Sequence, residues 1–130
     1  MDNEEENVLT SEKLEPLLGQ LWKCGAEDTA YGEYDPETSG ALHNHCGCVA
    51  YVVQQVMGGD IMQGKVCGVS HQWNRVDDIE FDLCSEQFGK TGITFFPQSK
   101  GRKAPQRKNI NPRFLKFWNR FKENNNNENS

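Results

Sequence analysis

The chain has 130 residues, of which 35% are hydrophobic and 25% are charged. This length suits one small domain and is too short for two ordinary ones. The longest apolar stretch, over residues 49–57, is too short to cross a bilayer, and the acidic start of the chain is unlike a signal peptide. We therefore expect a single-domain cytoplasmic protein that is neither exported nor embedded in a membrane.

Charge is divided unevenly along the chain. Residues 1–99 carry 17 acids and 5 bases, a net charge of −12, whereas residues 100–130 carry 9 bases and 2 acids, a net charge of +7. A solvated basic segment over residues 100–108 that balances an acidic body is the simpler interpretation, because an acidic body would repel the phosphates of a nucleic acid. We expect no nucleic acid among the partners and leave the oligomeric state open.

Both ends of the chain are predicted to be disordered tails. Residues 1–9 are acidic and residues 123–130 are rich in asparagine, so neither segment can bury enough apolar area to offset the loss of chain entropy. The predicted domain covers residues 10–122. Its first helix starts with Thr10 or Ser11 as the N-cap. An apolar stripe with helical spacing follows, formed by Leu14, Leu17, Leu18, Leu21 and Trp22.

A long loop over residues 25–45 precedes a second helix. A loop of this length in so small a domain usually shapes a site. The second helix begins near residues 44–46 and ends at Gly58–Gly59. Helical spacing places Cys46 within its apolar arc, at the first turn, and Cys48 on the flank. Backbone N–H groups in a first turn favour a thiolate. The arc itself consists of Val49, Val52, Val53, Val56 and Met57.

Two strands are predicted over residues 69–76 and 79–84, joined by a two-residue turn at Asp77–Asp78. This turn sets the pairing of the two strands: Val76 lies opposite Ile79, and each step back along the first strand is matched by a step forward along the second, so that paired residue numbers sum to 155. His71, Trp73, Asp82 and Cys84 then share one face, with His71 diagonally opposite Asp82. The other face is apolar and needs a cover that the terminal helices could provide; it carries Val76, Ile79, Phe81 and Leu83.

A last helix is predicted over residues 111–122, with Asn111 as N-cap and Pro112 at the first helical position. Its apolar side is formed by Phe114, Leu115, Phe117, Trp118 and Phe121. The expected fold class is therefore α+β, with a central cysteine-bearing helix packed on an antiparallel sheet of three or more strands and with a helix at each end.

Cys46, His71 and Asp82 are the residue types that thiol catalysis requires. The thiol needs a base that makes and keeps it a thiolate, and the imidazole needs an acceptor that fixes its tautomer and orientation. The same geometry is also compatible with a small buried cysteine and an ordinary cross-strand pair. The chain has five cysteines and no export signal, so we expect reduced thiols.

Three stretches of the chain carry a family resemblance. They are Cys46–Gln54 with Gly58–Ile61, Ser70–Arg75, and Phe81–Leu83 with Glu86–Phe88. In order and spacing they resemble the YunG-like family of small bacterial proteins, which is grouped with the transglutaminase-like and papain-like thiol fold. The resemblance implies a papain/transglutaminase-like core with Cys46 as nucleophile, His71 as base and Asp82 as its acidic partner. The chain departs from the family pattern at two positions. Glutamine is usual where this chain has His45, and threonine is common where it has Cys84.

Four further residues are candidates for contacting the substrate or the oxyanion: His45, Gly47, Trp73 and Asn74. Trp73 could wall the site against water or simply belong to the core. We expect no cofactor and no metal. The hypothesis is a cysteine-dependent hydrolase or acyltransferase, acting as an amidase, deamidase, peptidase or transglutaminase-like enzyme through a thioester. Its substrate would be a protein, a peptide or a small amide.

Two alternatives stay open. The first is a non-catalytic binding module that uses the cleft around Trp73, since a fold never guarantees activity. The second is a zinc site in the tract His43–Cys48, completed by Cys67 or His71. The ligands of that tract are spaced more tightly than in known zinc motifs, and part of the tract is already helical, so four of them could not surround one ion tetrahedrally.

Overall fold

The computed structural model describes residues 9–66, 68–84, 92–99, 101–106 and 108–129, and within this part of the chain the fold is α+β. Its helices are α2 (Ser11–Trp22), α3 (Pro36–Ser39), α4 (Cys46–Met57) and α5 (Pro112–Asn129). One antiparallel sheet has the strand order β4-β3-β2-β1-β5. Its strands are β1 (Asp60–Val66), β2 (Val69–Val76), β3 (Ile79–Asp82), β4 (Thr94–Phe96) and β5 (Arg102–Lys103).

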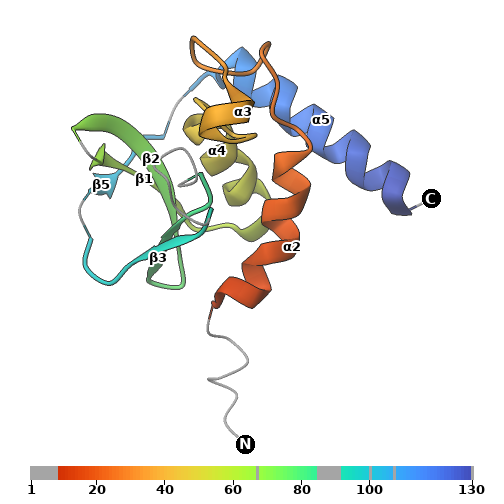
Figure 1. The fold of residues 1–130 in the computed structure, drawn as a ribbon. Coiled ribbons are helices and arrows are strands. Elements are labelled where there is room, and N and C mark those ends of the chain that lie inside the picture. The colour runs from red at the N-terminus through yellow and green to blue at the C-terminus, as the bar shows by residue number, and fades with distance from the viewer. Residues whose placement is uncertain (1–8, 67, 85–91, 100, 107, 130) are drawn as a thin grey trace, which may run out of the picture.

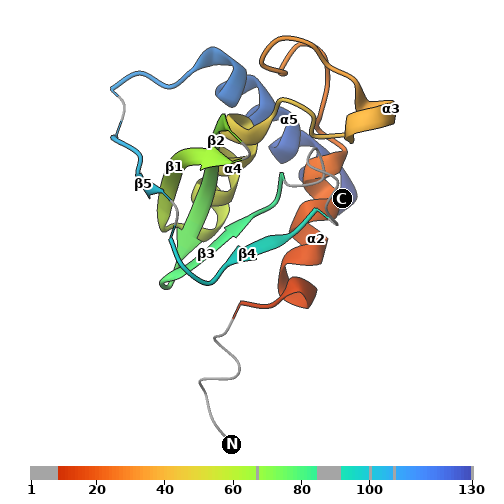
Figure 2. The same ribbon diagram turned by 60° about the vertical axis from the view of Figure 1, so that its left-hand side comes forward.

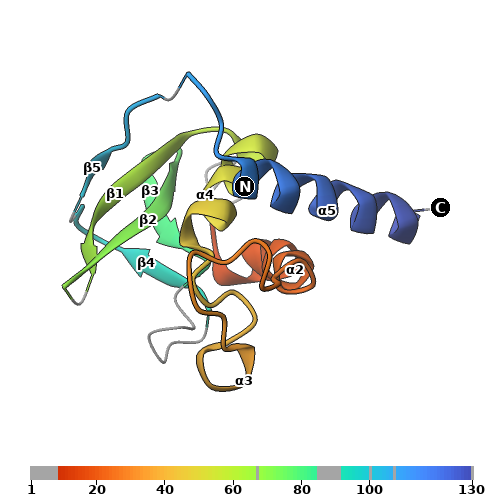
Figure 3. The same cartoon turned by 90° about the horizontal axis from the view of Figure 1, so that it is seen from above.

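Helix α4 is the middle layer of the molecule. Figure 3 shows it between the sheet on one side and helices α2 and α5 on the other. It contacts β1, β2 and α5, and α2 also contacts α5. The sheet and α5 lie at opposite sides of the molecule, as Figure 1 shows. The core between these layers is built from buried side chains of all of them, including Leu14, Leu18, Leu21, Val49, Val52, Val53, Phe81, Leu83, Phe114, Phe117 and Phe121.

The first helix forms as predicted. Thr10 is its N-cap, and the Thr10 side chain accepts a hydrogen bond from the Lys13 N–H. The stripe of Leu14, Leu18 and Leu21 is buried. Trp22, predicted to belong to that stripe, is 40% exposed, because it stands at the last residue of the helix.

Helix α4 begins at Cys46 and ends before Gly58, as the sequence indicates. Val49, Val52 and Val53 are buried, but Val56 is 48% exposed and the predicted stripe is wrong at that position. Cys48, which the sequence places on the flank of this stripe, is fully buried. A helix in the middle layer is covered on two sides, so its flank is as buried as the stripe that faces the sheet.

The predicted hairpin is confirmed in register. Arg75 pairs with Glu80 and Val76 pairs with Ile79. Asp77 and Asp78 both have positive φ, 51° and 65°, as the favoured two-residue hairpin turn requires. Strand β3 ends at Asp82, two residues earlier than predicted.

The sheet also contains three strands that the sequence analysis did not identify. Strand β1 pairs with β2 along its whole length, from Asp60 opposite Arg75 to Val66 opposite Val69. Strand β4 adds to β3, and the two-residue strand β5 adds to the outer side of β1. Figure 2 shows β5 beside β1 at this edge of the sheet. The edge becomes important below because it borders the candidate site.

The last helix is longer than predicted: α5 continues to Asn129 instead of ending at residue 122. Asn125 supports the extra turns, since its side-chain amide donates to the Phe121 carbonyl at 2.8 Å. Leu115 is 41% exposed, so the predicted apolar side is too wide there. Residues 1–8 of the predicted N-terminal tail lie outside the described residues. Among the helices that the structure describes, none has the length and apolar character needed to cross a membrane.

Candidate active site

His71 and Asp82 form a buried hydrogen-bonded pair. Nε2 of His71 donates to Oδ2 of Asp82 at 2.7 Å, and both side chains are about 3% exposed. Asp82 is itself fixed, because its Oδ1 accepts the backbone N–H of Cys84 at 2.8 Å. The hairpin therefore brings together the diagonal pair that its register predicts, and the acid holds the imidazole in one orientation.

Cys46 is the third member of the group. It occupies the first position of α4, its thiol forms no disulfide and is only partly buried, and it lies close enough to His71 to help raise the pKa of the imidazole. A cavity of about 440 Å³ opens beside the pair. Its lining consists of Cys46, Gln63, Gly64, Lys65, Ser70, His71, Gln72 and Arg102.

The surroundings of His71 favour the imidazolium form. Burial alone would lower the pKa of His71, but hydrogen bonds and negative charge from Asp82 and Cys46 outweigh it and raise the pKa to about 9. At neutral pH the ring is then positively charged. An imidazolium between a carboxylate and a thiol is the partner that a thiolate nucleophile requires.

Trp73 supports the histidine and does not line the cavity. It is 1% exposed, its ring stacks beside that of His71 at a centroid distance of 6.3 Å, and it packs on Phe96 at 5.2 Å. Its indole N–H donates to Oε1 of Glu80 at 2.8 Å. The expectation that Trp73 contacts a substrate is wrong for this structure, because β4 and the segment at Gly101 cover the indole.

Asn74 and Gly47 hold elements together. The Asn74 amide donates to the Ala50 carbonyl of α4 at 3.0 Å and is 1% exposed, so it fixes the helix to the sheet and cannot reach a substrate. A Cβ on Gly47 would lie 2.6 Å from Cζ of Phe114. Gly47 thus permits the close approach of α5 to α4, and its backbone N–H remains in the first turn beside Cys46.

His45 faces away from the cavity. Its ring is fully buried between Tyr34 and Phe117, at centroid distances of 5.4 and 5.5 Å. Nδ1 donates to the His43 carbonyl at 2.7 Å, so Nε2 is the acceptor for the Ala26 N–H at 3.3 Å and for the Thr29 hydroxyl at 2.7 Å. The side chain predicted to contact the oxyanion instead ties the long loop to the start of α4.

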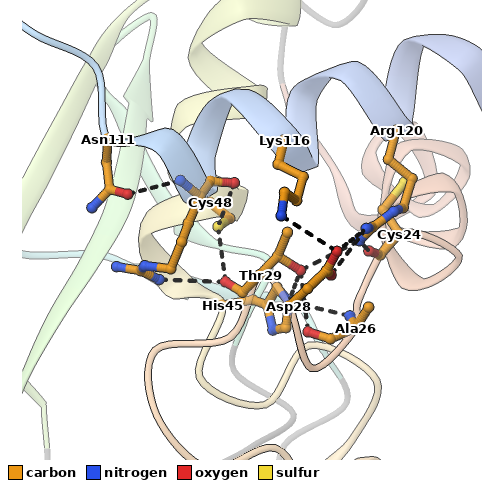
Figure 4. Close-up of polar contacts among 10 residues, drawn as sticks. Cys24, Ala26, Asp28, Thr29, His45, Cys48, Asn111, Lys116 and Arg120 are labelled. Atoms are coloured by element: carbon orange, nitrogen blue, oxygen red, sulfur yellow. Dashed lines mark hydrogen bonds and ion pairs between the residues drawn. The ribbon is translucent and has the colours of Figure 1, made fainter.

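The same loop also joins α4 to α5, as Figure 4 shows. The Thr29 carbonyl accepts from the Cys48 thiol at 3.5 Å and from the Arg113 guanidinium at 3.3 Å. Arg120 donates to both oxygens of Asp28 at 2.9 Å, and this hydrogen bonding lowers the pKa of Asp28. We call Asp28, Thr29, His45, Cys48, Arg113 and Arg120 the loop network.

The loop network keeps its histidine neutral and its thiol protonated. Burial lowers the pKa of His45, and the charge of Arg113 acts in the same direction, against the hydrogen bond to the His43 carbonyl. Burial also raises the pKa of Cys48 to about 12. The Cys48 thiol is therefore protonated at neutral pH, which is not the form that a nucleophilic cysteine needs.

The tract His43–Cys48 does not converge on one point. His43 Nδ1 accepts the Asp35 N–H at 2.8 Å, while His45 and Cys48 face the loop network and Cys46 faces the cavity. No three histidine, cysteine or acidic side chains of the described residues are grouped so that they could hold a metal ion. Cys67, considered above as a further ligand, lies outside those residues.

The sequence analysis missed the residues that surround Cys46 and His71 in the cavity. Gln72 matters most, because it also lines a second cavity of about 790 Å³ between α4, the start of β1 and the start of α5. This second cavity is lined by charged, apolar and amide side chains, among them Asp60, Lys103, Tyr51, Gln54, Ile61, Gln106, Ile110 and Phe114. Identifying either set from sequence requires β1 and β5, which lack a clear alternating pattern.

Cys84, opposite His71 in the predicted register, is a buried packing residue. It is fully buried, and its thiol donates to the Leu42 carbonyl at 3.2 Å. It therefore holds the end of the long loop against the end of β3, and its N–H orients Asp82. No disulfide joins any two of the described cysteines, which are Cys24, Cys46, Cys48 and Cys84.

Comparison with known proteins gives one match. A family model described as YunG protein matches residues 10–126, which is most of the chain and includes Cys46, His71 and Asp82. No curated protein and no solved structure matches the chain.

Proposed function

The chain belongs to the YunG family, and we propose that it is a cysteine-dependent hydrolase or acyltransferase in which Cys46, His71 and Asp82 act as a catalytic triad on a papain/transglutaminase-like core. One observation carries the proposal. The imidazole of His71 is held by a buried carboxylate on one nitrogen, and the only partly buried Cys46 thiol lies near the ring and lines the same open cavity.

The reaction starts from the ion pair in which His71 already carries the proton of Cys46, and the Cys46 thiolate attacks the carbonyl carbon of an amide. The S–C bond forms while the carbonyl oxygen takes up negative charge. Collapse of this tetrahedral intermediate breaks the C–N bond, and the leaving amine takes the proton of the His71 imidazolium. A thioester on Cys46 remains.

The thioester is then passed to a second nucleophile. Neutral His71 removes a proton from water or from an amine, which attacks the thioester carbonyl, and the thiolate leaves with the imidazolium restored beside it. Water gives hydrolysis or deamidation, and an amine gives acyl transfer. All three outcomes use the same residues in the same roles.

The oxyanion has two groups of donors within reach of the first turn of α4. The backbone N–H groups of Cys46 and Gly47 lie at the N-terminus of a helix whose dipole favours negative charge. The amide of Gln72 lines the same cavity and lies next to Gly47. We assign to Gln72 the side-chain role that the sequence suggested for His45.

The test is the pH dependence of alkylation of each cysteine by iodoacetamide, measured by mass spectrometry on the intact protein, on His71→Ala and on Asp82→Asn. We expect Cys46 alone to react at pH 6, with a rate about 100-fold lower in His71→Ala and about tenfold lower in Asp82→Asn. His43→Ala is the matched control, because His43 hydrogen-bonds in the loop and not to Cys46. Circular dichroism checks that each variant is folded.

A Cys46 that reacts as an ordinary thiol, with the same pH profile in His71→Ala, would contradict the proposal. The binding module would then be the better explanation of the two cavities. A panel of amides and thioesters, compared between the wild-type protein and Cys46→Ala, then distinguishes hydrolysis from acyl transfer by the product formed with and without added amine.

A further inference from the structure

The cavity beside Cys46 is positively charged, although the protein is acidic. The whole chain has a net charge of −5, and residues 1–99 carry −12. Yet Lys65 and Arg102 both line this cavity, whereas none of the described residues of its lining is a carboxylate. The local charge is therefore opposite to that of the body around it.

The sheet register explains how the two cations meet. Arg102 of β5 lies opposite Gln63 of β1, and Lys65 is two residues further along β1 on the same face. Asn74, opposite Ile61, also belongs to that face and donates to α4. The cations thus lie on the face that α4 covers, and α4 begins at Cys46. Figure 2 shows β1 and β5 side by side at this edge.

Two neighbouring cations of the sheet are neutralised by a carboxylate, whereas Lys65 and Arg102 are not. Arg75 and Lys103 both bind the carboxylate of Asp60, at 2.7 and 3.2 Å. In the part of the chain that the structure describes, Lys65 and Arg102 pair with no carboxylate. Adjacent residues of a strand point to opposite faces, so Asp60 holds Lys103 and leaves Arg102 to the cavity.

We propose that Lys65 and Arg102 determine specificity by binding a carboxylate of the substrate, so that the substrate is an amide with a carboxylate close to the scissile bond. The inference rests on the proposed function, because it concerns the substrate of the same thiol. Arginine binds a carboxylate through two parallel hydrogen bonds, and lysine adds a mobile charge. Unpaired cations in a cleft also raise the local concentration of an anionic ligand.

Two small alkylating reagents test the charge of the cavity directly. Iodoacetate and iodoacetamide undergo the same reaction, in which the Cys46 sulfur forms an S–C bond and iodide leaves, but only iodoacetate carries a carboxylate. The ratio of their rate constants at Cys46 therefore cancels the intrinsic reactivity of the thiolate. It retains the preference for the anion.

We expect this ratio to fall about fivefold in Lys65→Gln/Arg102→Gln at low ionic strength, and to fall in the wild-type protein as salt is raised. The control Lys116→Gln/Lys122→Gln removes two exposed cations from α5 and is expected to leave the ratio unchanged. An equal ratio in the wild-type protein and the cavity variant would overturn the inference.

The two proposals fail in different ways. If the alkylation rate of Cys46 depends on His71 but Cys46 shows no preference for iodoacetate, the result would sustain the triad and refute the carboxylate site. A Cys46 without activation refutes the triad, whatever the ratio. Blocked peptide amides in matched pairs then locate the carboxylate: one pair differs by glutamate against glutamine, the other by a free against an amidated C-terminus. Faster turnover of the acidic member of a pair identifies whether the recognised carboxylate is a glutamate side chain or a C-terminus. Equal turnover within both pairs refutes the inference.

Discussion

Cys46 and Cys48 stand two residues apart in the first turn of α4, and each lies near a histidine. Cys46 is partly exposed and lies near the imidazole of His71, whose pKa Asp82 helps to raise. Cys48 is fully buried, donates to the Thr29 carbonyl and lies in the loop network with a neutral His45. The comparison teaches that a carboxylate beside a buried histidine raises its pKa, whereas burial without one lowers the pKa of His45 and raises that of the Cys48 thiol.

The largest expected difference is in the reactivity of the two thiols. In the folded protein at pH 7 we expect Cys46 to be alkylated more than 1000-fold faster than Cys48. Burial shields Cys48, and with a pKa of about 12 only about one molecule in 10⁵ carries its thiolate at that pH. Mass spectrometry after timed iodoacetamide labelling measures both rates. Labelling in 8 M urea is the control, where the two rates should converge; similar rates in the native protein would show that the loop network opens readily.

The two histidines also predict opposite effects of pH on the free energy of unfolding. His71 has its pKa raised from 6.5 to about 9, so its contribution is complete below pH 6.5 and is lost as pH rises through about 9. This shift corresponds to at most about 3 kcal/mol. His45 has a lowered pKa, so its contribution is complete above pH 6.5 and declines as the pH falls below that value.

Stability should therefore be greatest near pH 6.5. Urea unfolding between pH 5 and pH 9.5 measures the curve. In His71→Gln the decline above pH 6.5 should be weaker while the decline on the acidic side remains, and His45→Gln should show the reverse. A curve that His71→Gln leaves unchanged would contradict the charged pair at the candidate site.

The smallest expected effect concerns the hydroxyl of Thr29. Thr29→Val leaves a buried His45 nitrogen without its partner at 2.7 Å, so we expect a loss of about 1–3 kcal/mol in the free energy of unfolding. Thr38→Val is the control, because Thr38 is exposed and should lose less than about 0.5 kcal/mol. Alkylation of Cys46 should keep its pH profile in Thr29→Val. A displaced pH profile would show that the loop network and the candidate site, on opposite sides of the first turn of α4, are coupled.

The proximity of Cys46, His71 and Asp82 could be predicted because each of their relations is local or helical. The two-residue turn sets the register that joins His71 to Asp82, and Cys46 is placed by the start of an amphipathic helix. The environment of His45 and Cys48 could not be predicted. It depends on a loop that folds back onto α4 and on a helix 65 residues further along the chain, and neither relation has a sequence period.

The cavity lining was beyond sequence analysis for a related reason. Gln63, Lys65 and Arg102 meet because β1 and β5 pair across the edge of the sheet. Strand β1 contains Gly64 and charged ends, and β5 has two residues, so neither carries a strand signal strong enough to be recognised. Trp73 and Asn74 stand beside His71 in sequence, but burial on both faces of β2 makes them supports of the site.

The turn at Asp77–Asp78 has a consequence for how this chain tolerates changes in length. Alternate residues of a strand point to opposite faces, so one residue added to or removed from the turn would slide β3 by one position against β2. Asp82 would then move to the opposite side from His71, with every amino acid of the triad still present. Loops elsewhere can lengthen at little cost, whereas at this turn a single insertion converts a triad into three unrelated side chains.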